Sequence, residues 1–313
     1  MISEERKAQL FRQGYRIVGN HSAVKICLYC KKAIRGEDVC YKSVFYGIKS
    51  WRCVQMTPIL DVCNLRCSWC WRNLRYTNIR FEGKFDKASD VVDGCIEEQR
   101  KLLMGFKGMP ENIDKKRFEE AMNPKHFAIS LTSEISLYPG LPELIDEIKK
   151  RGMTAFFVTN GTNPDMLRKL KRHAPTQLYI TVPAPDEKTF KKVCKPLSEG
   201  LWEKILESLE ILGDFKRGTV RLTLAKDMNF FNPRGYGRLL SRYSFDFLEV
   251  KAAMPVGYAQ YRMRYSQMPW HEEIVEFGRK IGKETGLKIT SQKRESRVVL
   301  LTGERSVERM LRI

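Results

Sequence analysis

Short apolar runs alternate with amphipathic segments along most of the chain beyond Cys70. The apolar runs span about five to seven residues, which is typical of strands that are buried on both faces of a parallel sheet. The segments between them place apolar residues three and four positions apart, which indicates helices that bury one face. The predicted strands are 126–132, 154–161, 177–182, 218–225, 245–253 and 296–301. The predicted helices are 141–152, 164–173, 201–215 and 271–286.

An α/β chain with six or more such units favours a partial or near-complete (β/α) barrel of the TIM type. The run 54–60 predicts the first barrel strand. The residues before it lack the alternation and are predicted to form an N-terminal extension packed against the barrel. We therefore divide the chain into an extension, 1–53, and a barrel domain, 54–313, within one compact unit.

Polar residues follow several of the predicted strands. In a barrel of this kind, chemistry gathers where the strands end and the loops begin. These residues are therefore candidates for an active site: Thr132, Ser133, Glu134, Thr159, Asn160, Thr181, Arg221 and Lys251.

The net charge of +19 indicates what kind of partner the protein binds. Residues 1–80 hold 15 Lys and Arg against 5 Asp and Glu, so the excess is concentrated there. A surface stabilised by ion-pair networks would balance its signs, so a polyanion such as nucleic acid is the favoured partner. No apolar run is long enough for a membrane span, and the first residues lack a signal-peptide core. We expect a soluble, cytoplasmic protein that does not bind membranes.

Three of the nine cysteines lie within eight residues, in the stretch CNLRCSWC. Cysteines of a cytosolic protein are more often metal ligands or catalysts than disulfide partners. A structural zinc site uses four protein ligands, whereas Cys63, Cys67 and Cys70 offer three. Three thiolates leave one iron of a four-iron cluster without a protein ligand, and that iron can hold a substrate or a cofactor.

This spacing, with the aromatic Trp69 before the last cysteine, resembles the radical S-adenosylmethionine (SAM) superfamily. The resemblance implies that the three cysteines hold a 4Fe-4S cluster whose open iron takes SAM, which is cleaved reductively to a 5′-deoxyadenosyl radical. It also implies that Glu134, in TSEIS, accepts the cofactor's ammonium although the family's usual glycines and proline are missing. Asn160, in TNG, would bind the ribose or the carboxylate, Thr181 would keep a hydroxyl in an altered fourth loop, and Trp69 would pack near the adenine.

A second group of cysteines precedes the first. Twelve residues separate Cys27 from Cys40 and Cys40 from Cys53, and Cys30 lies close to Cys27. Four thiolates would form a closed zinc site, and three would form another open cluster. The spacing permits both.

The equal spacing, together with HSAVKIC, CYKSVFYGI, WRC and MPVGYAQ, resembles the tRNA 4-demethylwyosine synthases from about residue 15 to 300, in their single-domain archaeal form. The resemblance implies a second 4Fe-4S cluster on Cys27, Cys40 and Cys53, with pyruvate at its open iron and Cys30 as a neighbour. It also implies that Lys42 forms a Schiff base with pyruvate, and that an external donor supplies electrons.

The reaction that this resemblance implies is a carbon insertion on tRNA-Phe, classed as a carbon–carbon lyase or synthase. The radical would take a hydrogen from the N-methyl group of 1-methylguanosine at position 37, next to the anticodon. The resulting methylene radical would add to pyruvate, and loss of its carboxyl carbon with cyclisation would build a third ring. Two segments that mix arginines with aromatic residues, 71–80 and 251–265, are predicted to contact the anticodon loop. We expect a monomer.

Two other function classes fit the sequence less well. One is a different radical SAM enzyme, such as a glycyl-radical activase or another RNA modifier. The other is a non-catalytic, metal-stabilised RNA-binding paralogue, which the altered glutamate and TVPAPD loops allow. Metal analysis separates them, because two clusters carry about eight irons, one cluster carries about four, and a binding module would carry zinc.

Overall fold

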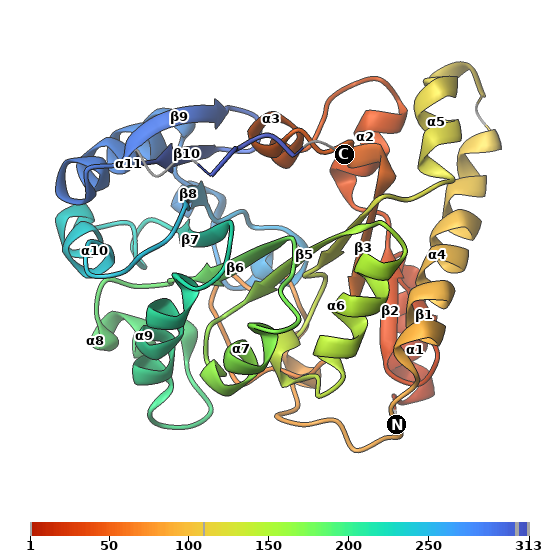
Figure 1. The fold of residues 1–313 in the computed structure, drawn as a ribbon, viewed down its shortest axis with the longest axis horizontal. Helices are drawn as coiled ribbons and strands as arrows, with labels where there is room; N and C mark the ends of the chain where they lie inside the picture. Colours follow the sequence, from red (N-terminus) through yellow and green to blue (C-terminus); the bar gives the residue numbers. More distant parts are fainter. Residues whose placement is uncertain (1, 109, 304–306, 312–313) are drawn as a thin grey trace.

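A computed structural model describes residues 2–108, 110–303 and 307–311. One sheet of ten strands runs through the molecule in the order β1-β2-β3-β4-β5-β6-β7-β8-β10-β9 (Figure 1). The strands are β1 (Arg16–Val18), β2 (Ser22–Lys25), β3 (Cys53–Thr57), β4 (His126–Ile129), β5 (Thr154–Thr159), β6 (Gln177–Thr181), β7 (Gly218–Leu224), β8 (Phe247–Ala252), β9 (Lys288–Lys293) and β10 (Val298–Thr302). The helices are α1 (Glu4–Arg12), α2 (Leu28–Ile34), α3 (Tyr41–Tyr46), α4 (Ala88–Met104), α5 (Lys115–Ala121), α6 (Leu141–Lys150), α7 (Pro164–Leu170), α8 (Glu187–Cys194), α9 (Leu201–Leu212), α10 (Pro233–Leu240) and α11 (His271–Thr285).

The predicted parallel α/β sheet is confirmed over its central part. Strands β3 to β8 pair in parallel and in sequence order. The sheet stays open, with β1 and β9 at its two edges, so the fold is a partial barrel. Within the described part of the chain, no helix combines the length and the apolar character that a bilayer crossing requires.

Both ends of the sheet depart from the parallel pattern. The strand predicted at 296–301 exists as β10, but it runs antiparallel to β8. The edge strand β9 was not predicted, because its sequence KITSQK is polar and alternates exposed with half-buried residues. At the other end β1 and β2 are antiparallel, and β2 pairs with β3. The N-terminal segment therefore adds two strands to the main sheet.

The alternation of side chains along each strand separates two apolar layers. One set packs under the outer helices and forms the main core, for example Phe127 and Phe157 against Leu144 and Ile148. The opposite set faces inward, where Phe156, Tyr179, Phe247 and Leu300 pack against three aromatic residues of α3, which are Tyr41, Phe45 and Tyr46. Helix α3 thereby fills part of the inner face of the curved sheet and leaves a cavity beside it.

Candidate active site

A cavity of about 540 Å³ lies on the inner face of the sheet. Its wall is built by strands β3 to β8, by the loops that follow them and by the segment that carries α2 and α3. Every site residue predicted from the sequence lines it: Cys27, Cys40, Lys42, Cys53, Cys63, Cys67, Trp69, Cys70, Glu134, Asn160 and Thr181. Residues up to about 150 positions apart in the chain thus meet at one place.

The loop that follows β3 is fixed at several points. The backbone N–H of Cys63 donates to Asn78 O at 2.8 Å, and the N–H of Cys70 donates to Cys67 O at 3.0 Å. Further along, Ser68 N donates to Val193 O at 2.9 Å, at the end of α8. Because backbone contacts hold the loop, three thiols of one short segment face the same cavity.

Burial raises the pKa of the Cys63 thiol to about 12. The neighbouring Cys194, to which the sequence assigned no role, is the main cause of a raised pKa at Cys67, and burial adds to it. Such thiols keep their protons until a metal displaces them. Arg72 lies beside them, only 7 % exposed, and its Nη1 has no hydrogen-bond partner among the described residues. Burial opposes its charge, yet Cys70 and Cys63 raise the pKa of Arg72.

A buried cation next to three thiols fits an anionic iron–sulfur cluster with thiolate ligands. Arg72, which belongs to the segment predicted to contact RNA, is thus buried beside the cysteines and lines the same cavity. Tyr76 of the same segment is also engaged within the protein. Its ring lies under the guanidinium of Arg6 at 4.5 Å, and its hydroxyl donates to Glu5 at 3.2 Å.

The upstream cysteines come from three elements. Cys27 caps the N-terminus of α2, Cys40 precedes α3, and Cys53 begins β3. Burial raises the pKa of all three thiols, that of Cys27 to about 11. Cys30 is absent from the described wall of the cavity and is fully buried. Its thiol donates to Trp51 O at 3.5 Å, and burial, followed by the nearby Cys27, Cys53 and Cys40, raises the pKa of the thiol.

In the part of the chain that the structure describes, no three His, Cys, Asp or Glu side chains converge closely enough to hold a single metal ion. A cube of four irons and four sulfides is larger than one ion, so its thiolate ligands stand farther apart. Three cysteines around a cavity wall fit such a cube, and Cys30 is not among the described residues of that wall.

Lys42 is the second residue of α3 and is 9 % exposed. Its Nζ lies 4.7 Å from the ring centre of Tyr179 and 4.9 Å from that of Phe156. Within the described chain its side-chain nitrogen makes no hydrogen bond or ion pair. Burial, and then the nearby Arg221, lower the pKa of Lys42. A lysine in this setting is suited to act as a neutral amine.

Glu134 is 3 % exposed and links two strand ends. Its Oε2 accepts the backbone N–H of Asn160 at 2.7 Å, and its Oε1 accepts the N–H of Ser136 at 3.0 Å and the hydroxyl of Thr159. Burial raises the pKa of Glu134, and the three donors oppose this. Glu134 therefore caps the turn at Ile135–Leu137 and also presents a carboxylate to the cavity.

Asn160 is held by a residue that the sequence did not indicate. Its Nδ2 donates to Asn64 Oδ1 at 3.0 Å, and its Oδ1 accepts from Thr162 N at 3.0 Å. Asn64 directly follows Cys63, so the cysteine loop and the third strand end are joined. Thr181 lies half-buried at the end of β6, paired with Arg221 in the register of β7. Trp69 lines the cavity and packs against the main core.

The segment 251–265 is pinned against the cysteine loop. Gly257 has a φ of +56°, and a Cβ there would lie 2.8 Å from Trp71 O, so only glycine fits. Tyr258 N donates to Trp71 O at 2.9 Å, and the guanidinium of Arg262 donates to Cys70 O. The segment thus forms a rim beside the first group of cysteines.

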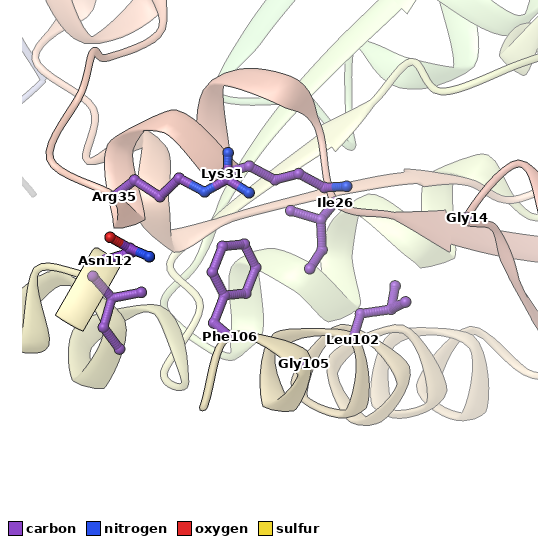
Figure 2. A pocket seen from close by; sticks show the side chains of 9 residues that line it. Gly14, Ile26, Lys31, Arg35, Leu102, Gly105, Phe106 and Asn112 are labelled. Atoms are coloured by element: carbon purple, nitrogen blue, oxygen red, sulfur yellow. The ribbon is translucent and has the colours of Figure 1, made fainter. Parts of the chain in front are cut away.

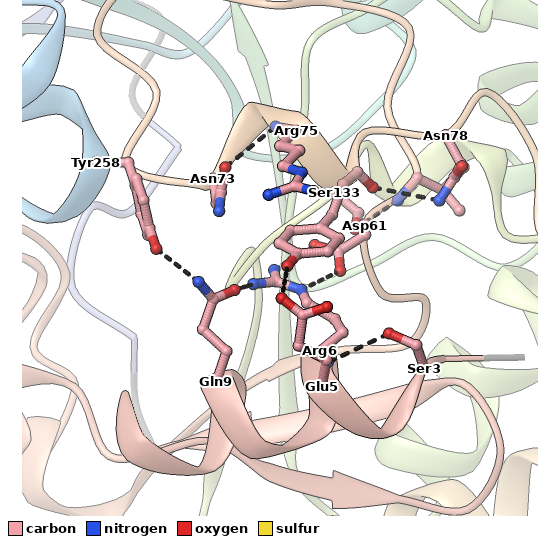
Figure 3. A network of polar contacts seen from close by, with 12 residues as sticks. Ser3, Glu5, Arg6, Gln9, Asp61, Asn73, Arg75, Asn78, Ser133 and Tyr258 are labelled. Carbon is pink, nitrogen blue, oxygen red and sulfur yellow. Dashed lines mark hydrogen bonds and ion pairs between the residues drawn. The ribbon is translucent and has the colours of Figure 1, made fainter.

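Helix α1 takes part in a network of polar contacts with the residues around the cysteine loop (Figure 3). Arg6 is paired with Asp61, and Gln9 donates to the hydroxyl of Tyr258 at 2.7 Å. The helix therefore contacts both the start of the cysteine loop and the rim segment. Sequence reasoning did not reveal it, because the partners lie 55 and 249 positions apart.

A second cavity, of about 260 Å³, lies between α2 and the end of α4 (Figure 2). Its wall combines the apolar Ile26, Leu102 and Phe106 with the cations Lys31 and Arg35. None of the predicted site residues is among the described residues that line it. We therefore place the active site in the larger cavity.

The cysteine loop after the first parallel strand of an open α/β sheet, facing polar strand ends, is the arrangement of a radical SAM protein. A family model for the radical SAM superfamily matches residues 57–230, and one for wyosine base formation matches residues 242–303. Membership of this superfamily implies SAM and one 4Fe-4S cluster.

Comparisons over the whole chain identify the family within the radical SAM superfamily. The S-adenosyl-L-methionine-dependent tRNA 4-demethylwyosine synthase of Pyrococcus horikoshii is 44% identical over 300 residues, which are 94% of this chain and 87% of that protein. The enzyme of the same name from Methanocaldococcus jannaschii is 36% identical over 310 residues, 97% of each chain. A solved structure of TYW1 with a lysine-pyruvate adduct bound has a TM-score of 0.89 and 35% identity, and the match covers 99% of this chain and 98% of that one. The chain belongs to the tRNA 4-demethylwyosine synthase family.

Proposed function

We propose that this protein is a tRNA 4-demethylwyosine synthase that joins carbons of pyruvate to 1-methylguanosine at position 37 of tRNA-Phe. One observation carries the proposal. Two groups of three cysteines and the buried Lys42 line a single cavity on the inner face of the sheet. A site for SAM and a site for a keto acid are then close enough to serve one reaction.

In this proposal Cys63, Cys67 and Cys70 hold the 4Fe-4S cluster of the superfamily. When bound, the cluster and SAM supply the 5′-deoxyadenosyl radical. Glu134 presents its carboxylate to the ammonium of the cofactor, since charge-assisted pairs are strong in a buried site. Asn160 and Thr181 offer polar groups beside it, and Trp69 offers an aromatic surface for the adenine.

Cys27, Cys40 and Cys53 hold a second 4Fe-4S cluster in the same cavity. Lys42 forms a Schiff base with pyruvate: its neutral amine attacks the ketone carbon, the carbonyl oxygen leaves as water, and an imine results. The rings of Phe156 and Tyr179 lie beside its Nζ and cover part of the amine. The adduct in the TYW1 structure is also a lysine–pyruvate adduct, which supports this assignment.

The anticodon loop binds over the rim of the cavity. Trp71, Met254 and Val256 line the opening, and the neighbouring Tyr261 and Tyr265 are 75% and 66% exposed. Exposed rings of this kind stack on unpaired bases, and the basic surface attracts the phosphates. A guanosine splayed out of its loop can then enter the cavity.

Reductive cleavage of SAM consumes an electron, so we also propose that an external donor supplies it. Because one chain provides all eleven predicted site residues, we propose that the enzyme acts as a monomer. The overall change places the enzyme among those that make and break carbon–carbon bonds.

The proposal is tested by anaerobic incubation of reconstituted protein with methylated tRNA, SAM and isotopically labelled pyruvate. We expect a tricyclic nucleoside that carries the label. We also expect about eight irons with matching sulfide per chain. Absence of the labelled nucleoside under reducing conditions in which SAM is cleaved would leave a radical SAM enzyme with a different substrate. Zinc in place of iron would indicate a binding protein.

A further inference from the structure

Three cations gather on the inner face of the sheet. Lys42 comes from α3, Arg221 from β7 and Lys251 from β8, and all three line the cavity. In the register of β7 and β8, Arg221 lies opposite Glu249 and Thr223 lies opposite Lys251. Lys251 is therefore two residues nearer to the carboxyl end of β8 than Glu249, the partner of Arg221.

Arg221 is fully engaged within the protein. Its Nε donates to Glu249 at 2.9 Å, its Nη2 donates to Tyr41 Oη at 2.8 Å, and its guanidinium lies 4.5 Å from the ring centre of Tyr179. The other oxygen of Glu249 accepts the hydroxyl of Tyr46 at 2.8 Å. The charges of Arg221 and Glu249 thus neutralise each other, and both oxygens of Glu249 accept hydrogen bonds within the protein.

Lys251 lacks such a partner. Among the described residues its ammonium makes no hydrogen bond or ion pair, and its Nζ lies 5.4 Å from the ring centre of Tyr41. The charged or titratable groups that act on it are Arg221, Cys40, Glu249 and Lys42, and burial itself disfavours its charged form. A cation held in a cavity wall without a counter-ion is costly. An anion bound in the cavity would remove that cost.

The proposed substrate brings such an anion. Pyruvate offers a ketone and a carboxylate on adjacent carbons. If Lys42 takes the ketone carbon, as proposed above, the carboxylate of pyruvate keeps its negative charge. Of the two other cations of this group, Arg221 is paired with Glu249, whereas Lys251 makes no ion pair with a described residue. We propose that Lys251 binds the carboxylate of the keto acid while Lys42 forms the Schiff base. Lys251 is then a substrate-binding residue that selects 2-keto acids over simple ketones.

This inference rests on the proposed function, and one experiment separates the two. Reconstituted protein is incubated anaerobically with increasing concentrations of pyruvate and with cyanoborohydride, and the modified lysine is mapped by peptide mass spectrometry. The wild-type protein is expected to carry the adduct on Lys42. In Lys251→Met, the pyruvate concentration for half-maximal trapping should rise roughly 10- to 100-fold, which corresponds to the loss of one charge-assisted contact. Lys251→Arg, which keeps the charge, should recover most of that loss.

Acetone provides a matched control, since it has the ketone without the carboxylate. Wild type and Lys251→Met should trap acetone equally, which a merely structural role for Lys251 would not produce. Lys251→Gln serves as a second neutral variant, and iron content and melting temperature report whether each variant is folded. An unchanged pyruvate curve in a folded neutral variant, parallel losses with pyruvate and acetone, or an adduct mapped to Lys251 would each overturn the inference. If the wild type traps no pyruvate on any lysine, the proposed function itself fails.

Discussion

Arg6 donates two hydrogen bonds to Asp61, from Nε to Oδ2 at 2.6 Å and from Nη2 to Oδ1 at 2.7 Å (Figure 3). Both side chains are almost fully buried. Asp61 has a φ of 58°, in the left-handed region, and its carbonyl accepts Asn78 N at 2.8 Å. Since Cys63 N in turn donates to Asn78 O, the ion pair fixes the backbone from which the cysteine loop starts.

Breaking this pair should damage the first cluster site. Arg6→Met leaves Asp61 buried and unpaired, which costs about 3–5 kcal/mol of unfolding free energy. We expect a lower midpoint in urea, and iron loss confined to the cluster held by Cys63, Cys67 and Cys70. Denaturation curves and electron paramagnetic resonance of the reduced protein measure the two effects. Arg12→Met, an exposed position on the same helix, is the control. Equal behaviour of the two variants would show that the pair does not support the loop.

The upstream cysteines should differ in their effect on iron content. Cys27→Ala removes a proposed ligand and is expected to lower the iron content from about eight to about four per chain. Cys30→Ala should leave it at about eight, since its thiol faces Trp51 O. Iron and sulfide analysis after anaerobic reconstitution decides between them. A loss of iron in the Cys30 variant equal to that of the Cys27 variant would contradict our assignment.

His126 should make the metal-free protein sensitive to acid. Burial, and then Arg52 and Lys125, lower the pKa of His126 to about 3. Its Nε2 accepts the backbone N–H of Lys49 at 3.2 Å, and its Nδ1 lies 2.7 Å from Thr154 Oγ1, so the neutral ring fits both partners. The folded state then binds this proton less readily than the unfolded state. The stabilisation is complete above about pH 6.5 and is lost as the pH falls towards 3, by up to about 1.4 kcal/mol per pH unit.

Unfolding free energies of metal-free protein between pH 7 and pH 4 test this. His126→Gln is expected to be less stable than wild type at pH 7 but to lose less stability on acidification. His173→Gln, at a half-buried position where the imidazole pairs with Asp146, serves as the control for removing a histidine. A His126→Gln variant that loses stability as steeply as wild type would show that His126 is not the responsible group.

The rim tyrosines should contribute to tRNA binding and not to pyruvate binding. Replacing Tyr261 and Tyr265 together by alanine removes two exposed rings, each worth about 1–3 kcal/mol if it stacks on a base. We expect weaker tRNA binding in a filter or fluorescence assay, with unchanged trapping of pyruvate on Lys42. Phe231→Ala, which removes an exposed ring outside the rim, is the control. Unchanged tRNA affinity in the double variant would exclude the rim as the RNA contact.

The sequence predicted the parts of the molecule that depend on local pattern. Strands β3 to β8 are buried on both faces, and their continuous apolar runs identify them. The cysteines and the polar strand ends singled out from the sequence line one cavity, because parallel strands bring their carboxyl ends together. Edge strand β9 was missed since one face of it meets solvent and its sequence is polar.

Long-range pairings were beyond sequence reasoning. Nothing in the sequence around Arg6 indicates that Asp61 is its partner. Arg72 lies in a basic segment that was predicted to face RNA, and only the fold shows that its side chain is buried beside the cysteines. Cys27 is the N-cap of α2, and Cys30 lies in the first turn of that helix. The thiol of Cys30 donates to Trp51 O, a contact that the cysteine spacing does not reveal. Such contacts depend on three-dimensional placement, which spacing does not encode.

The central claim is that one cavity brings a SAM-derived radical to the methyl group of a tRNA nucleoside. Its most direct test uses tRNA whose 1-methylguanosine carries a deuterated methyl group, with SAM, pyruvate and reductant under anaerobic conditions. Mass spectrometry of the 5′-deoxyadenosine should show one deuterium transferred, in step with consumption of the labelled nucleoside. Deuterium-free 5′-deoxyadenosine, formed while the methyl group stays intact, would contradict the account.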